Sequence, residues 1–175
     1  MTGKKIIIFG ALVLSLAFSF SNISFAETEV SSEKLENITM DCDSIKQTLK
    51  RVQNIDKNTR ISIGRSYQSI LTDFITPLNV RLVKNNKSSI ELNDIQARFA
   101  EARENFNHSY ISYSQEFENL LNTDCKNDSK TFYTQLEKTR EKRVEVADSM
   151  KKIREIINEH TKEVRKIKDT FEVKK

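Results

Sequence analysis

The rarest reactive side chains in this sequence are two cysteines, Cys42 and Cys125, and two histidines, His108 and His160. Neither cysteine lies in a CxxC motif, so the spacing does not indicate thiol–disulfide catalysis. The cysteines can instead form one structural disulfide with each other, or remain as two free, buried thiols. The choice between these states depends on the compartment of the protein and on the elements that carry the cysteines.

The histidines and their acidic neighbours do not form a pattern that binds a metal ion. Di-iron helical bundles need pairs of Glu-x-x-His motifs, whereas His108 follows Glu104 by four residues and His160 precedes Glu163 by three. The sequence also lacks an HExxH motif, a glycine-rich phosphate loop and a Gly-x-Ser-x-Gly motif. We therefore interpret both histidines as ordinary polar or half-buried residues, and carboxylates such as Glu101 as solvated. The sequence predicts no enzymatic activity, no metal ion and no cofactor.

Residues 1–26 have the features of a secretory signal peptide. Two lysines precede an apolar run over residues 6–20, and Ser24-Phe25-Ala26 places small residues where a signal peptidase recognises them, with cleavage before Glu27. An uncleaved membrane anchor is the alternative, but the apolar run spans only 15 residues, whereas a spanning helix needs about 18 or more. The sequence therefore predicts export across the cytoplasmic membrane, to a secreted, periplasmic or cell-surface location. Disulfides persist in such locations.

The charged residues that follow are arranged in blocks of alternating sign. Residues 27–40 carry a net charge of −3, residues 41–88 of +5, residues 89–125 of −5 and residues 126–175 of +5. We interpret the later blocks as an acidic helix packed between two basic ones, because opposite charges at the rims favour that arrangement. The alternative is that the basic helices present faces to an anionic surface. The total of +2 over residues 27–175 is too small to indicate a nucleic-acid partner.

Apolar residues recur at steps of three and four from Cys42 onward, which predicts a first long helix. Its predicted buried stripe is Cys42, Ile45, Leu49, Val52, Ile63, Tyr67, Ile70, Phe74, Leu78 and Leu82. The polar stretch Asn54–Arg60 interrupts the stripe and is the expected weak point of the helix. Pro77 cannot donate a backbone hydrogen bond, so we expect a kink or a break near it. Residues 27–40, ahead of this helix, are expected to be a flexible acidic segment.

Two further long helices follow polar loops. The second is expected to begin near Asn93, with Gln96 as a capping-box partner, and the third near Asp128 or Ser129. The aromatic stripe of the second helix is interpreted as core rather than as a base-stacking platform. Its members are Phe99, Phe106, Tyr110, Tyr113 and Phe117. In the third helix, the apolar repeat over 146–171 extends beyond the shorter second helix, so a homo-oligomer is left open.

Short loops force consecutive helices to run antiparallel, and this geometry determines where the cysteines lie. The midpoint between Cys42 and Cys125 falls just before the polar loop Asn85–Ser89. Residues equidistant from the turn of a hairpin are neighbours, so the cysteines are expected within the ~4.4–6.8 Å Cα separation that a disulfide needs. The sequence thus predicts an all-α domain over residues 41–175, an antiparallel, coiled-coil-like bundle of three long helices joined by this disulfide.

Two stretches carry a resemblance to known proteins, Cys42-Asp-Ser-Ile-Lys and Phe74-Ile-Thr-Pro-Leu-Asn-Val-Arg-Leu-Val-Lys-Asn-Asn86. They resemble segments of small secreted helical proteins of uncharacterised role in candidate-phylum bacteria. The resemblance implies a bacterial origin and export, and it carries no activity. The chain is also similar to periplasmic holdase chaperones of the Skp/OmpH kind, which are short, exported, basic and long-helical. Those chaperones assemble through a small β-body, and this sequence has no period-two alternation that predicts a strand.

These features predict a non-enzymatic, exported helical bundle that acts as an interaction or structural module, either secreted or in the cell envelope. Its expected partner is a protein or an envelope component. The alternative functions are a holdase chaperone of the Skp kind, or a binder of anionic envelope polymer or lipid through the basic helices. Contact with the membrane is expected only through residues 1–26, if the signal segment is retained.

Overall fold

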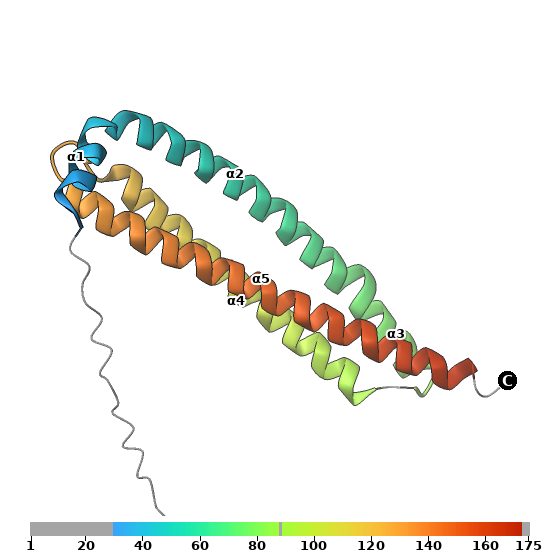
Figure 1. Cartoon of the computed structure of the whole chain (residues 1–175). Helices are drawn as coiled ribbons and strands as arrows, with labels where there is room; N and C mark the ends of the chain where they lie inside the picture. The colour runs from blue at the N-terminus through green and yellow to red at the C-terminus, as the bar shows by residue number, and fades with distance from the viewer. Residues whose placement is uncertain (1–29, 88, 173–175) are drawn as a thin grey trace, which may run out of the picture.

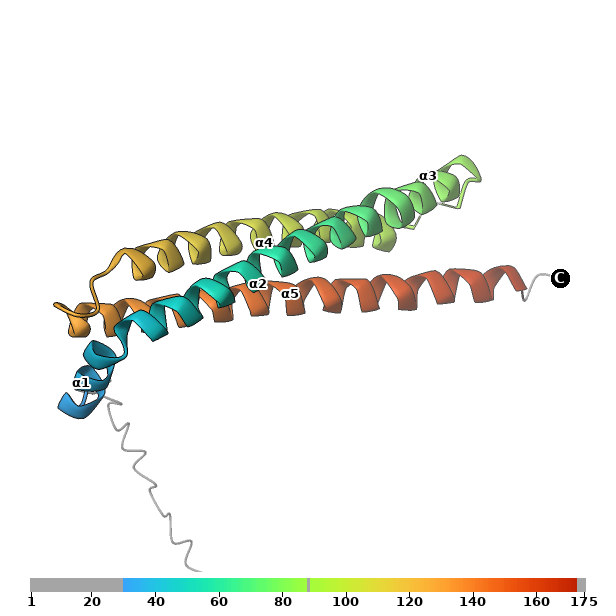
Figure 2. The same ribbon diagram turned by 90° about the horizontal axis from the view of Figure 1, so that it is seen from above.

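The computed structural model describes residues 30–87 and 89–172, and within them every regular element is a helix. The elements are α1 (Ser32–Met40), α2 (Cys42–Ser69), the π-helical segment η1 (Ile70–Ile75), α3 (Thr76–Lys84), α4 (Ile90–Asn122) and α5 (Ser129–Glu172). α2, η1 and α3 follow one another without a break and form a first rod of 43 residues. This rod, α4 and α5 pack antiparallel, which confirms the predicted all-α bundle (Figure 1, Figure 2). The predicted signal peptide, residues 1–26, lies outside the described residues.

α4 is the helix that the first rod and α5 share. It packs along α5 over most of its length, and its other contacts are with α2, η1 and α3. No Cα atom of α2, η1 or α3 lies within 8 Å of a Cα atom of α5, so contact between these two rods is made by side chains. The acidic helix therefore lies between the two basic rods, as the charge blocks predict.

The buried apolar residues form two clusters along the bundle. The larger cluster joins all three rods and consists of Tyr67, Ile75, Leu92, Ile95, Phe99, Ala102, Phe106, Ile153 and Ile156. The smaller cluster lies at the end that carries α1 and consists of Ile38, Cys42, Leu120, Cys125 and Phe132. Burial of apolar surface is the dominant favourable contribution to folding, so these two clusters hold the rods together.

The expectation of a flexible segment at residues 27–40 is wrong where α1 forms. Ser31 caps α1 by accepting a hydrogen bond from the backbone N–H of Lys34 at 3.4 Å. Ile38 is buried in the smaller cluster, and the Lys34 ammonium lies 4.3 Å from the centre of the Tyr133 ring of α5. One buried apolar anchor and one cation–π contact thus dock this short helix.

The kink expected near Pro77 takes the form of a π-helical turn just before it. Pro77 lies in the first turn of α3 and has no N–H to donate, and the N–H of the preceding Thr76 bonds to the Leu71 carbonyl, five residues back. A π turn holds one more residue than an α turn, so the apolar stripe shifts by one position. Ile75, 1% exposed, takes the core position, whereas Phe74 is 65% exposed. The prediction that Phe74 is buried is therefore wrong.

α4 begins three residues before the start expected near Asn93. Ser89 is its N-cap, and the Ser89 Oγ accepts a hydrogen bond from the Leu92 N–H at 3.2 Å. Gln96 has a different role from the expected capping-box partner, because its side-chain carbonyl accepts a hydrogen bond from the Asn79 amide of α3 at 2.7 Å. The cap and the Asn79 contact together fix the hairpin between α3 and α4.

Replacing Ser89 with alanine is expected to lower the free energy of unfolding by about 1 kcal/mol, because the hydrogen bond that caps the helix is lost. Asn93→Ala is the matched control, since Asn93 is exposed within α4 and alanine is the better helix former there. Urea unfolding followed by circular dichroism measures both variants. A loss of stability in Asn93→Ala, with none in Ser89→Ala, would mean that the helix begins at the later position.

Candidate functional site

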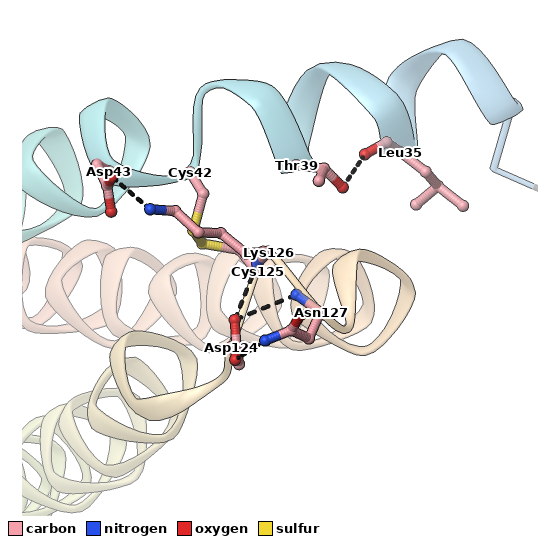
Figure 3. Close-up of a disulfide and its surroundings, with 8 residues drawn as sticks. All are labelled: Leu35, Thr39, Cys42, Asp43, Asp124, Cys125, Lys126 and Asn127. Atoms are coloured by element: carbon pink, nitrogen blue, oxygen red, sulfur yellow. Dashed lines mark hydrogen bonds and ion pairs between the residues drawn. A yellow bond between two sulfur atoms is a disulfide. The ribbon is translucent and has the colours of Figure 1, made fainter.

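The two cysteines meet where the loop after α4 passes the start of α2 (Figure 3). Cys42 and Cys125 form a disulfide with a Cα–Cα distance of 5.6 Å, which confirms the pairing expected from the hairpin. Both are buried in the smaller cluster. Beside them, the Lys126 ammonium lies 2.6 Å from a carboxylate oxygen of Asp43, so an ion pair joins the same two segments. A buried disulfide offers no thiolate for chemistry, so this site is structural.

Two aspartates shape the loop that carries Cys125. Asp124 accepts hydrogen bonds from the side-chain amide and backbone N–H of Asn127, and these bonds lower its pKa below the ordinary value. Asp128 accepts a hydrogen bond from the Thr131 N–H at 3.0 Å, which caps α5 as expected. Hydrogen bonding from the Thr131 side chain, and then from its N–H, lowers the Asp128 pKa. Both carboxylates therefore hold the loop in the shape that brings Cys125 to Cys42.

A polar layer lies between the two apolar clusters and joins all three rods. Asp56 of α2 accepts hydrogen bonds from the Tyr113 hydroxyl of α4 at 2.6 Å and from two nitrogens of the Arg143 guanidinium of α5, each at 3.0 Å. One turn further along α2, the Arg60 guanidinium donates to the Asn107 side chain at 3.2 Å. Asp56 and Arg60 belong to the polar stretch Asn54–Arg60, the expected weak point of the first helix. The structure shows that α2 is continuous through this stretch.

Sequence reasoning missed this layer, although a signal for it was present. The polar stretch Asn54–Arg60 and the polar patch over residues 137–145 of the third helix interrupt their apolar stripes, and the Arg143–Asp56 ion pair, at 3.0 Å, joins the two. A second ion pair between rods, at 2.7 Å, joins Arg98 of α4 to Glu159 of α5. In both pairs the acidic residue lies on a rod of net positive charge, Asp56 on the first rod and Glu159 on α5. The charge blocks predict that the acidic residues of such pairs lie on α4, and this prediction is wrong for both pairs.

The polar layer keeps the Tyr113 hydroxyl protonated. Burial raises the pKa of Tyr113 above its ordinary value, and the hydrogen bond to the Asp56 carboxylate raises it further. A tyrosine in the unfolded chain ionises at about pH 10. Above that pH the unfolded chain loses a proton that the folded protein keeps, so the unfolded state gains stability relative to the fold.

The free energy of unfolding is therefore expected to fall as the pH rises above about 10, and to fall less steeply in Tyr113→Phe. The slope does not vanish in the variant, because burial also raises the pKa of Tyr67 and of Tyr110. Below that pH the contribution of Tyr113 is fully present and independent of pH. Urea unfolding at pH values on both sides of the transition measures the slope. Identical slopes in the unsubstituted protein and in Tyr113→Phe would contradict the assignment of this pH dependence to Tyr113.

Phe74, displaced by the π turn, forms one wall of an open groove between η1, α3 and α5. The groove has a volume of about 520 Å³ and is lined by Asp73, Phe74, Pro77, Leu78, Arg81, His160, Thr161, Val164 and Arg165. A smaller hollow of about 190 Å³ adjoins it at Leu78 and Val164, and Leu82, Leu92 and Ile167 also line this hollow. An apolar floor with a few polar groups around it is typical of a ligand site, so this groove is the candidate functional site.

Several polar groups of the groove residues have no partner among the residues that the structure describes. The guanidinium groups of Arg81 and Arg165 make no hydrogen bond or ion pair with the side chains that the structure describes. The buried Nε2 atom of His160 likewise has no partner among those residues, and burial lowers the pKa of this histidine. The arrangement is suited to binding, and the described part of the chain holds no cluster of three or more metal-ligating residues.

The other residues singled out in the sequence lie where the interpretation puts them. Four members of the aromatic stripe are buried and Tyr110 is partly buried. His108 is exposed and lies 3.3 Å from Glu104 of the same helix. His160 is partly buried and Glu101 is exposed. Among these residues, only His160 lines the groove.

The fold and the groove define a class of protein: an elongated all-helical bundle with a disulfide at one end and a cationic, apolar groove near the other. Within the described ranges, no helix is both long and apolar enough to span a membrane. The disulfide is consistent with an oxidising compartment. Comparison with known proteins gives no match to a family model, to a curated protein or to a solved structure.

Proposed function

We propose that this chain is an exported, non-enzymatic binding module of the cell envelope or of the extracellular space. The observation that carries the proposal is the groove between α3 and α5, where an exposed phenyl ring and two arginines flank an apolar floor. Helices hold such a surface rigidly, and rigid sites lose little conformational freedom when a ligand binds. The polar groups without partners among the described residues then supply specificity.

Export is supported by the disulfide and by the start of the sequence. The Cys42–Cys125 disulfide is buried in an apolar cluster and spans 83 positions of the chain, and such structural disulfides are rare in reducing compartments. Residues 1–26 have the charge, apolar run and cleavage triplet of a secretory signal peptide. The two observations are independent of each other, and they favour the same location.

A second candidate function is binding of an anionic envelope component through the basic rods. It is favoured by the position of Arg81 and Arg165, which belong to different basic rods and line the same groove. Affinity that depends on exposed charges weakens as the salt concentration rises. A holdase chaperone of the Skp kind would instead suppress the aggregation of an unfolded client protein. Salt titration and an aggregation assay therefore separate these functions.

Photocross-linking in the producing cells tests the proposed function. A photoreactive phenylalanine analogue at Phe74 is expected to capture a partner. The same analogue at Ile111 or Val144, which are 50% and 60% exposed outside the groove, is expected to capture none. Cell fractionation is expected to find the oxidised protein outside the cytoplasm. Equal capture at all three positions, no capture at Phe74, or reduced protein in the cytoplasm would contradict the proposal.

A further inference from the structure

We infer that the groove between α3 and α5 binds one molecule of a single-chain amphiphile with an anionic head group, of the fatty-acid type. The inference rests on the proposed function, because it names the ligand class for the same groove. Three properties carry it: the size of the groove, its continuous apolar floor and the arginines at its rim.

The size of the groove matches a small molecule better than a partner helix. Its volume of about 520 Å³ lies in the range of ligand pockets, about 300–1,000 Å³. A helix as long as α3 would be about 13 Å long and 10–12 Å across, and would fill roughly 1,200 Å³. A helix from another protein or from a second copy of this chain would therefore leave most of its volume outside. An alkyl chain is slender enough to lie inside.

The floor of the groove is apolar along both rods. Phe74, Pro77 and Leu78 come from the first rod, and Val164 comes from α5. The adjoining hollow of about 190 Å³ continues this floor to Leu82, Leu92 and Ile167. Removal of an alkyl chain from water against such a surface is favourable in proportion to the area buried. The π turn contributes directly, because it moves the Phe74 ring from the core to the groove.

The rim of the groove carries the charge that an anionic head group needs. Arg81 comes from α3 and Arg165 from α5, and a guanidinium binds a carboxylate through two parallel hydrogen bonds. Asp73 is the one carboxylate among the lining residues, and the hydroxyls of Ser69 and Thr72 already donate to it. The two guanidinium groups outnumber this carboxylate, so the rim keeps a net positive charge.

Calorimetric titration of the oxidised full-length protein with dodecanoate, below its micelle concentration, tests the inference. Dodecyltrimethylammonium keeps the tail and reverses the charge of the head, whereas butanoate keeps the carboxylate and removes most of the tail. Dodecanoate is expected to bind about tenfold or more tightly than either control, because only it satisfies both the floor and the rim. Backbone amide chemical shifts are expected to change at Phe74, Leu78 and Val164.

Matched variants separate the groove from the rest of the chain. Arg81→Gln/Arg165→Gln is expected to weaken dodecanoate binding by about tenfold, as the loss of two exposed ion pairs implies. Arg51→Gln/Arg65→Gln removes the same charge from exposed positions of α2 outside the groove, and is expected to leave binding unchanged. The apolar run over residues 6–20 is the same in every variant, so the difference between variants is the readout.

A second pair of variants tests the floor. Phe74→Ala is expected to weaken dodecanoate binding several-fold, whereas Ile55→Ala, at a position 62% exposed elsewhere on α2, is expected to have no effect. Equal affinity for dodecyltrimethylammonium, or unchanged dodecanoate affinity in the arginine variant, would overturn the inference. A dimer whose interface protects the groove would overturn it as well. If dodecanoate does not bind but the photoreactive analogue at position 74 still captures a protein in cells, the ligand class is wrong and the proposed function stands.

Discussion

Replacing Cys42 and Cys125 with alanine is expected to lower the free energy of unfolding by about 4 kcal/mol. The disulfide joins residues that are 83 positions apart, so it removes much of the conformational freedom of the unfolded chain. Without the disulfide the unfolded state regains that freedom. The native state gains no contact that offsets this change. The effect is therefore one of the largest that a change outside the larger apolar cluster can produce.

The effect is also expected to be local. At the end of the bundle that carries α1, the first rod is held by the smaller cluster, by the Asp43–Lys126 ion pair and by the disulfide. Loss of the disulfide is expected to raise hydrogen exchange in α1 and in the first turns of α2 more than in the middle of α4. Segments with fewer buried contacts open at lower free energy.

Urea unfolding of three samples measures the contribution of the disulfide: the oxidised protein, the same protein with reductant, and Cys42→Ala/Cys125→Ala. The reduced protein is the matched control, because it keeps both sulfur atoms in the apolar cluster. Both altered samples are expected to unfold at lower urea concentration than the oxidised protein. A reduced protein as stable as the oxidised one would show that the disulfide contributes nothing to folding.

Replacing Phe99 with alanine is expected to cost about 4 kcal/mol, in the range for a buried phenylalanine. Phe99 is 0% exposed, and its ring contacts the Tyr67 ring of α2 edge to face at a centroid distance of 6.4 Å. Ile153 and Ile156 of α5 belong to the same cluster. Because α4 is shared by both other rods, truncation here leaves a cavity at the junction of all three.

Ile111→Ala is the matched control for Phe99→Ala. Ile111 lies on the same helix but is 50% exposed, so its truncation is expected to change stability by less than about 0.5 kcal/mol. Phe99→Leu is expected to cost less than Phe99→Ala, because leucine fills part of the cavity. Equal losses for Phe99→Ala and Ile111→Ala in urea unfolding would mean that the buried face of α4 is wrongly assigned.

The long helices and the disulfide could be predicted because they depend on local patterns and on chain symmetry. Apolar residues at steps of three and four predict helices, and short loops make neighbours antiparallel. Equal distances from the hairpin turn then bring Cys42 to Cys125. The burial of Phe99 and Phe117 follows from the same periodicity, because it requires only that the apolar side of the helix face its neighbours.

The docked α1 helix and the polar layer could not be predicted in this way, because their contacts join distant residues. Lys34 reaches Tyr133, which is 99 positions away, and Asp56 reaches Arg143, 87 positions away. From the sequence alone, a charged or hydroxyl-bearing residue is equally compatible with exposure to solvent and with a buried partner. The partner is known only once the rods are placed side by side.

By itself, the sequence determined that the chain is helical, that it folds back twice and that the cysteines meet, because periodicity and loop length act over short distances. Only the tertiary structure decided which side of the first rod faces the core after Ser69. One extra residue in the π turn rotates the following helix by about 100° relative to the pattern before it. That rotation buries Ile75, exposes Phe74 and thereby forms the groove, and periodicity along the chain does not record it.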